Sequence, residues 1–196
     1  MIVRTITPPP GSAISVATEG AGPVITVPQP SGGAMRYFIG AFMLFWLGGW
    51  FMGFRTSSSQ VLSGHATPFL IFWLGGWTLA GGFAVWTLYR IFRPTVPETL
   101  KLGTDGIAYD SGVPPFRQDF RATTRNDAWK SYFPKRTIVT ISPQDLRSLR
   151  LRENEFENRL TVDVASVRFD LGRAASEVER EWLYRVLTER YSLPPA

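Results

Sequence analysis

Two apolar segments of this chain carry the same six-residue motif, and no charged residue interrupts either segment. The first runs from Tyr37 to Phe54 and contains Phe-Trp-Leu-Gly-Gly-Trp at 45–50; the second runs from Pro68 to Tyr89 and repeats the motif at 72–77. A helix needs ~20 predominantly apolar residues to cross a bilayer, and a stretch without a polar face favours lipid over water. The sequence therefore predicts a membrane α-helical hairpin in residues 35–93, with helices at about 37–54 and 68–92.

The basic residues predict how this hairpin is oriented. Arg36 precedes the first segment and Arg90 and Arg93 close the second, whereas the loop at 56–67 has no Lys or Arg. Positively charged flanks stay in the cytoplasm, so we expect a multi-pass protein of the cell inner membrane with both termini cytoplasmic. The formal net charge of +5 gathers around these segments, so we interpret it as a topology signal and expect no nucleic acid as a partner.

The doubled motif also predicts how the helices pack. In an antiparallel hairpin both copies lie at the same depth, and the motif reads nearly the same in reverse, so we expect Trp46 level with Trp77 and Trp50 level with Trp73. Small residues let membrane helices approach closely, and Trp is enriched at membrane interfaces. The predicted packing residues are Gly48, Gly49, Gly53, Gly75, Gly76 and Ala80, and the predicted interface aromatics are Trp46, Trp50, Trp73 and Trp77.

Two alternatives for this region stay open. The Trp-rich faces could hold a pigment, a quinone or a lipid. The remaining glycines Gly40, Gly81 and Gly82 could instead dock a helix of another subunit.

The N-terminal segment, residues 1–34, is rich in Pro and Gly but contains a possible β-hairpin. Residues 14–18 alternate, residues 24–27 are all β-branched, and Glu-Gly-Ala-Gly at 19–22 is typical of a turn. A lone two-stranded hairpin is marginal in water, so it would have to join the sheet of the C-terminal domain. The alternative is an unstructured tail.

The C-terminal region, residues 98–196, predicts an α+β domain. Strand patterns lie at 99–102, 107–110, 137–141, 149–152, 160–164 and 167–171. The period then changes, because Ser176 and Glu179 form a capping box before an amphipathic helix. We expect Val178, Trp182 and Leu183 on its buried face, with Trp182 as the anchor. The predicted fold is an antiparallel bent sheet or small barrel capped by this helix.

Three motifs in this C-terminal region resemble those of a known family. Asp-Gly at 105–106, Arg-Phe-Asp-Leu-Gly at 168–172 and Glu-Val-Glu-Arg-Glu-Trp-Leu at 177–183 resemble the bacterial pleckstrin-homology-like (PH-like) domains found after two membrane helices. The resemblance covers about the last half of the chain together with the hairpin. It implies a seven-stranded bent sheet capped by a helix beneath the membrane, and a scaffold or adaptor without enzymatic activity.

Few residues point to chemistry. The chain has no cysteine and a single histidine, His65, in the predicted outer loop, and the glutamates of 153–157 lie among arginines. No catalytic, cofactor-binding or metal-binding residue is therefore predicted, and no cofactor. One basic and aromatic stretch could contact a membrane surface or a partner, with Trp129, Lys130, Tyr132, Phe133, Lys135 and Arg136 as its candidates. Alternatively, these aromatics pack under the sheet and the charges are solvated.

These patterns favour a non-enzymatic membrane scaffold or accessory subunit. Its cytoplasmic domain would bind a protein or a lipid headgroup, and its partners would be the lipid bilayer and either another membrane protein or a second copy of the chain. The alternative is a cofactor- or pigment-contacting subunit of a membrane bioenergetic or transport complex. No ionisable residue lies well inside either segment, which counts against ion or proton transport.

Overall fold

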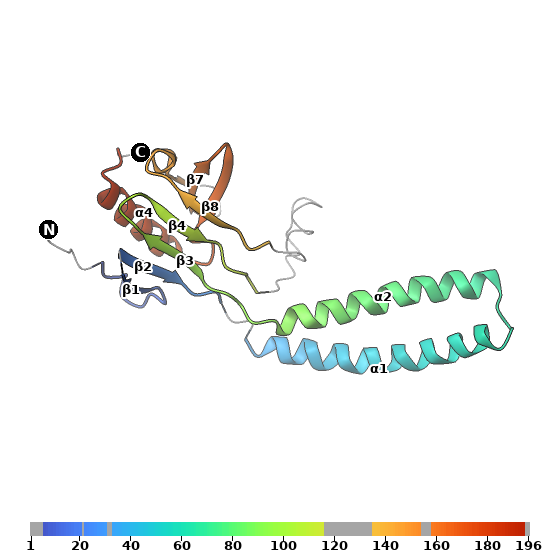
Figure 1. Cartoon of the computed structure of the whole chain (residues 1–196). Coiled ribbons are helices and arrows are strands. Elements are labelled where there is room, and N and C mark those ends of the chain that lie inside the picture. The colour runs from blue at the N-terminus through green and yellow to red at the C-terminus, as the bar shows by residue number, and fades with distance from the viewer. Residues whose placement is uncertain (1–5, 21, 31–32, 116–134, 154–157, 195–196) are drawn as a thin grey trace. The chain divides into compact units, whose positions relative to one another are not determined.

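The computed structural model describes residues 6–20, 22–30, 33–115, 135–153 and 158–194. It contains two compact units (Figure 1): the hairpin unit contains residues 31–94, and the sheet unit combines residues 1–30, 95–114 and 134–196. The expected combination of two long apolar helices, an antiparallel sheet domain and a C-terminal helix is confirmed.

The hairpin consists of α1 (Met35–Leu62) and α2 (Pro68–Phe92). Helix α2 begins where Thr67 caps it by accepting a hydrogen bond from the Leu70 N–H, with Pro68 at the first helical position. Helix α1 continues well beyond the predicted end at Phe54. The polar residues 56–60 stay helical, and the hydroxyl of Thr56 donates back to the carbonyl of Met52. The connection is therefore short, at 63–67.

The larger sheet combines strands that precede the helical hairpin in the chain with strands that follow it. Its order is β1 (Ser15–Glu19), β2 (Gly22–Val27), β3 (Glu98–Leu102), β4 (Ile107–Asp110) and β5 (Ile138–Ile141), and all neighbours are antiparallel. The hairpin expected near residues 14–27 is present as β1 and β2, and β2 pairs with β3 along Val24–Val27 and Glu98–Lys101. Helices α1 and α2 are thus an insertion between two paired strands.

A second sheet and a helix complete the sheet unit. Strands β6 (Arg150–Glu153), β7 (Asn158–Val164) and β8 (Val167–Leu171) form a three-stranded antiparallel sheet, preceded by the short 3-10 helix η1 (Asp145–Ser148) and followed by α4 (Glu177–Tyr191). Both sheets and α4 contribute to one hydrophobic core. Its most buried members include Ile25, Leu100, Ile107, Ile141, Leu160, Val162, Leu183 and Leu187.

Helix α4 begins at the predicted capping box. The Ser176 hydroxyl accepts from the Glu179 N–H, and the Glu179 carboxylate accepts from the Ser176 N–H. Trp182 is buried, as expected, but Val178 is 63% exposed, so its placement on the buried face was wrong. Arg180 lies in the buried stripe instead, because its guanidinium donates to the carbonyls of Ala175 and Asn158.

The strand order makes an N-terminal residue part of the sheet unit's core. Ile25 is 0% exposed, although the whole hairpin separates it from β3. We expect Ile25→Ala to destabilise the unit by about 3 kcal/mol, because it leaves a cavity in a packed core. Hydrogen–deuterium exchange of residues 98–110 should then accelerate by about a hundredfold.

Ile138→Ala is the matched control for this prediction. Ile138 lies in the edge strand β5 and is 71% exposed, so its truncation should change the exchange rates less than threefold. Equal acceleration by both variants would contradict the assignment of β2 to this core.

Candidate functional site

Two reciprocal hydrogen bonds between tryptophans connect α1 and α2. The indole N–H of Trp50 donates to the Trp77 carbonyl at 3.1 Å, and the indole N–H of Trp77 donates to the Trp50 carbonyl at 3.4 Å. Both are the last residue of their motif copy, so the repeat produces an approximate twofold relation across the hairpin. An indole N–H removed from water needs an acceptor, and a helical carbonyl has a second lone pair to offer.

This register differs from the expected one. Trp50 was expected level with Trp73, but it bonds to Trp77, one helical turn further along. Trp73 instead packs on Trp77 with ring centroids 4.3 Å apart, and Trp50 stacks on Phe54 at 5.2 Å. The aromatic residues therefore form a cluster that ties the helices together.

The predicted contact of glycine against glycine is also wrong. At four predicted packing residues, an added Cβ would meet no heavy atom within 4 Å in this structure; these are Gly48, Gly49, Gly75 and Gly76. Rings cover other glycines instead. A Cβ at Gly81 would overlap the Trp50 ring, one at Gly40 would lie 2.5 Å from the Phe92 ring, and Gly53 lies against Trp77. Each of these glycines makes room for an aromatic ring on the opposite helix, so the backbones need not touch.

An apolar groove lies between the helices next to this cluster. We name it the interhelical groove; it has a volume of about 340 Å³ and is lined by Phe42, Met43, Trp46, Ala80, Phe83, Ala84 and Thr87. Two of the predicted residues, Trp46 and Ala80, therefore line a concave surface. The only hydroxyl in the lining, that of Thr87, donates to the Phe83 carbonyl at 2.9 Å. The groove can accept an apolar chain.

In the sheet unit, a buried carboxylate joins the two sheets. Glu98 begins β3 and is 0% exposed. Its carboxylate accepts from the backbone N–H of Gly172 at 2.7 Å and from that of Arg173 at 3.1 Å, just after β8 ends. The first residue of the returning strand is thereby attached to the end of the second sheet.

Burial controls the ionisation of this pair of side chains. Desolvation raises the pKa of Glu98 above its ordinary value of 4.5, although the bonds from Gly172 and Arg173 oppose the shift. The neighbouring Tyr109 is 1% exposed, and its hydroxyl donates to the Asp170 carbonyl at 3.1 Å. Its burial, together with the Glu98 charge, raises the Tyr109 pKa well above its usual range. Both polar side chains therefore lie inside the core and not at the surface.

Sequence reasoning missed Glu98, although the signal was present. Leu100 and Leu102 face the core at alternate positions, and the same period extended backwards reaches Glu98. The predicted strand began at Thr99, so a charged residue on the buried face went unnoticed.

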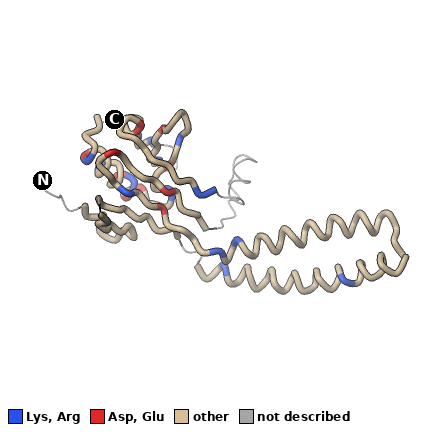
Figure 2. The backbone as a smooth tube through the Cα atoms, in the orientation of Figure 1, with Lys and Arg blue, Asp and Glu red and all other residues tan. Residues whose placement is uncertain are grey.

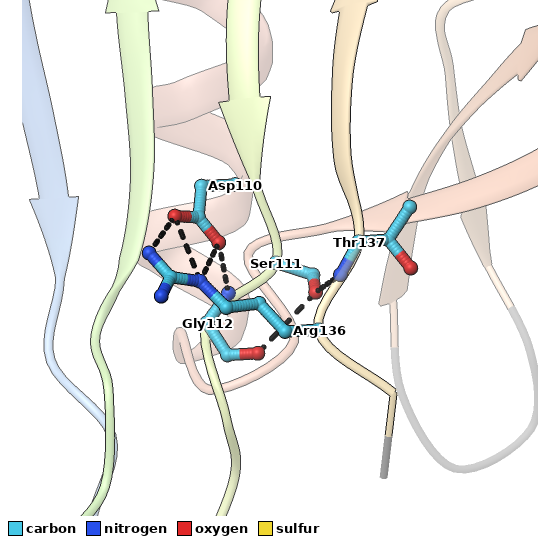
Figure 3. Close-up of polar contacts among 5 residues, drawn as sticks. All are labelled: Asp110, Ser111, Gly112, Arg136 and Thr137. Atoms are coloured by element: carbon cyan, nitrogen blue, oxygen red, sulfur yellow. Dashed lines mark hydrogen bonds and ion pairs between the residues drawn. The ribbon is translucent and has the colours of Figure 1, made fainter.

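An ion pair closes the turn region beyond β4 (Figure 3). Asp110 accepts from Arg136 Nη2 at 2.5 Å and from its Nε at 3.0 Å, and it also accepts from the Gly112 N–H. The bond from Arg136 holds the pKa of Asp110 below its ordinary value. The backbone N–H of Ser111 donates to the Thr137 carbonyl, and the backbone N–H of Thr137 donates to the Ser111 hydroxyl. These contacts hold the end of β4 against the start of β5.

The predicted contact stretch is only partly described. Trp129, Lys130, Tyr132 and Phe133 lie outside the described residues. Lys135 is exposed, and Arg136 is paired with Asp110. The Arg136 charge is thus partly compensated within the sheet unit.

Within the described ranges, no group of three or more His, Cys, Asp or Glu residues could hold a metal ion. His65 is exposed in the connection between α1 and α2, where its backbone N–H donates to the Gln60 carbonyl. Comparisons of the chain with family models, with curated proteins and with solved structures found no match.

The glycine assignment leads to a matched pair of substitutions. We expect Gly81→Ala to displace the Trp50 ring and weaken the hairpin by about 1–3 kcal/mol, as overpacking does. Its neighbour is the control: an added Cβ at Gly82 meets nothing within 4 Å in this structure. Gly82→Ala should be neutral or stabilising by about 0.5–1 kcal/mol through helix propensity. Thermal unfolding of the detergent-solubilised protein, followed by tryptophan fluorescence, measures both, and equal effects would contradict the ring-on-glycine packing.

The buried Glu98 leads to a pH-dependent prediction. Because its pKa is raised in the folded state, the folded protein holds this proton more tightly than the unfolded chain does. The resulting stability is fully present below the ordinary pKa of 4.5 and is lost as pH rises through the folded pKa. We therefore expect the stability of the wild type minus that of Glu98→Gln to fall as pH increases above this value.

Urea titrations of the detergent-solubilised protein at several pH values measure this difference. Glu177→Gln, at an exposed position of α4, controls for the loss of one carboxylate. If the free energy of unfolding of the wild type rose relative to that of Glu98→Gln as the pH increased, the assignment would be contradicted.

Proposed function

We propose that this protein is a non-enzymatic integral protein of the cell inner membrane that acts as a scaffold or accessory subunit. Its two helices span the bilayer with both chain termini in the cytoplasm. The sheet unit is a PH-like domain that presents a binding surface to a protein or a lipid headgroup.

The insertion of the helices between paired strands carries this proposal. The chain leaves β2 at Val27 and returns to β3 at Glu98, and these two residues are partners in the sheet. The connectors, 28–34 and 93–97, are short. The domain is thus tethered to its anchor by two linkers rather than by one. This double attachment suits a domain that works beside the membrane.

The character of the helices supports the membrane location. Both are long and apolar enough to cross a membrane, and only 6% of the most apolar window of each is buried. Large apolar side chains point outward, with Phe45 83% and Phe72 82% exposed. Figure 2 shows most of the basic residues of the hairpin at one end, a single one, Arg55, towards the other end, and no acidic residue along it. This distribution follows the positive-inside rule.

The order of elements in the sheet unit supports the PH-like assignment. Two antiparallel sheets share one core and are followed by a C-terminal helix that packs into it. The resemblance likewise implies an antiparallel sheet capped by a C-terminal helix, although with seven strands in one bent sheet instead of the five and three strands described here. The first two strands precede the membrane helices here, so the domain is formed from both sides of the insertion.

Affinity purification of the full chain from carbonate-washed membranes in mild detergent tests the proposal. We expect the protein in the membrane fraction, with another polypeptide or a second copy of the chain bound in fixed stoichiometry and no absorbance in the visible range. Recovery in the soluble fraction would contradict the membrane location. A stoichiometric chromophore would support the cofactor-contacting alternative instead.

A further inference from the structure

Two arginines at one end of the hairpin have buried nitrogens that lack an acceptor. Arg90, in the last turn of α2, is 2% exposed, and its Nε and Nη2 have no hydrogen-bond partner among the described residues. The Nε of Arg36, in the first turn of α1, is also buried without a hydrogen-bond partner among these residues. A buried charged donor without an acceptor is strongly unfavourable. These unpaired donors could bind an anion.

The hairpin itself supplies no such anion. No Asp or Glu occurs anywhere in residues 20–97. The contacts of Arg36 are with the neutral Tyr37, whose hydroxyl accepts from Arg36 Nη2 at 2.7 Å and whose ring lies 4.7 Å below the guanidinium. Arg93 follows directly after α2 and adds a third positive charge at this end. The hairpin and its two connectors therefore contain three positive charges at this end and no carboxylate to pair with them.

Both arginines lie in line with the interhelical groove. Seven residues make almost two full turns of an α-helix, so Arg36 lies on the same face of α1 as Met43. By the same spacing, Arg90 lies on the same face of α2 as Phe83. Met43 and Phe83 both line the groove, and Thr87, its lining residue nearest in sequence to Arg90, is one turn away. By this spacing, the interhelical groove and the two arginines lie along the same side of the hairpin.

We propose that the interhelical groove and its arginine end bind one anionic phospholipid, with the phosphate on Arg90 and Arg36 and an acyl chain along the groove. Guanidinium groups match phosphate oxygens in geometry and charge, and basic pockets between membrane helices on the cytoplasmic side hold anionic headgroups. The groove selects a lipid over free phosphate. The site rests on the membrane location proposed above.

The test uses the purified full chain in detergent and measures bound lipid by native mass spectrometry. The probes are dioleoylphosphatidylglycerol, dioleoylphosphatidylcholine and inorganic phosphate. We expect preferential binding of phosphatidylglycerol, weakened about tenfold by Arg90→Gln and by Arg36→Gln. Arg55→Gln is the matched control, because Arg55 is an exposed arginine on α1 far along the helix from Arg36; it should leave binding unchanged.

A second set of variants separates headgroup from tail. Ala80→Phe fills the groove and should weaken phosphatidylglycerol binding about tenfold without altering the arginines. Arg90→Lys keeps the positive charge but not the planar guanidinium, so its affinity should lie between those of the wild type and Arg90→Gln. Thermal unfolding of Arg90→Gln at the wild-type temperature would show that its loss of binding does not come from misfolding.

Three results would overturn the proposal. The first is equal binding by wild type and Arg90→Gln. The second is equal affinity for phosphatidylglycerol and phosphatidylcholine. The third is competition by inorganic phosphate that is as strong in Ala80→Phe as in the wild type, which would mark a site for free phosphate. Because the measurement needs only the purified chain, its outcome is independent of whether a protein partner co-purifies.

Discussion

The pairing of β2 with β3 brings together residues that the entire helical hairpin separates in the chain. Closing so long a loop would cost conformational entropy if the intervening residues were flexible. Most of these residues instead belong to α1 and α2, which run antiparallel and return the chain to the end of the hairpin from which it left. The strand pairing therefore behaves like a β-hairpin with a structured connection. The core contribution of Ile25 and the common side of both connectors depend on this pairing.

Glu98 strengthens the same junction. It is the partner of Val27 in the sheet, and its carboxylate accepts two backbone N–H groups at the end of β8. The residue at which the chain re-enters the sheet thus also links the five-stranded sheet to the three-stranded one. A buried carboxylate satisfied in this way is unfavourable to remove, because the two N–H donors would lose their acceptor.

One part of the hairpin surface packs the two helices together, and another part is free to contact other molecules. Aromatic rings from one helix fill the space above glycines of the other, and the Trp50–Trp77 bonds hold the register. Gly48, Gly49, Gly75 and Gly76 do not take part in this contact and face outward. The groove and the arginine end occupy another stretch of the same helices. The contacts between the two helices thus leave the outward-facing glycines and the interhelical groove available to other molecules.

Local chemistry explains which features were predictable from sequence. The apolar lengths predicted both helices, the period-two patterns predicted most strands, and Ser176 with Glu179 predicted the start of α4. The end of α1 was missed because Thr and Ser side chains can bond back to the helix, so a polar stretch need not end it. Val178 was misplaced because a helical face shows which residues align, but not where along the helix burial begins.

The sequence by itself determined the elements: two apolar helices, the strands around them, and the capped helix at the C-terminus. It did so because backbone periodicity and capping depend on neighbours only a few residues apart. The tertiary structure alone decided that β2 pairs with β3, that Trp50 meets Trp77 rather than Trp73, and that Glu98 and Arg90 are buried. Those outcomes depend on the offset between elements far apart in the chain, which is set by how their side chains pack together and not by any local pattern.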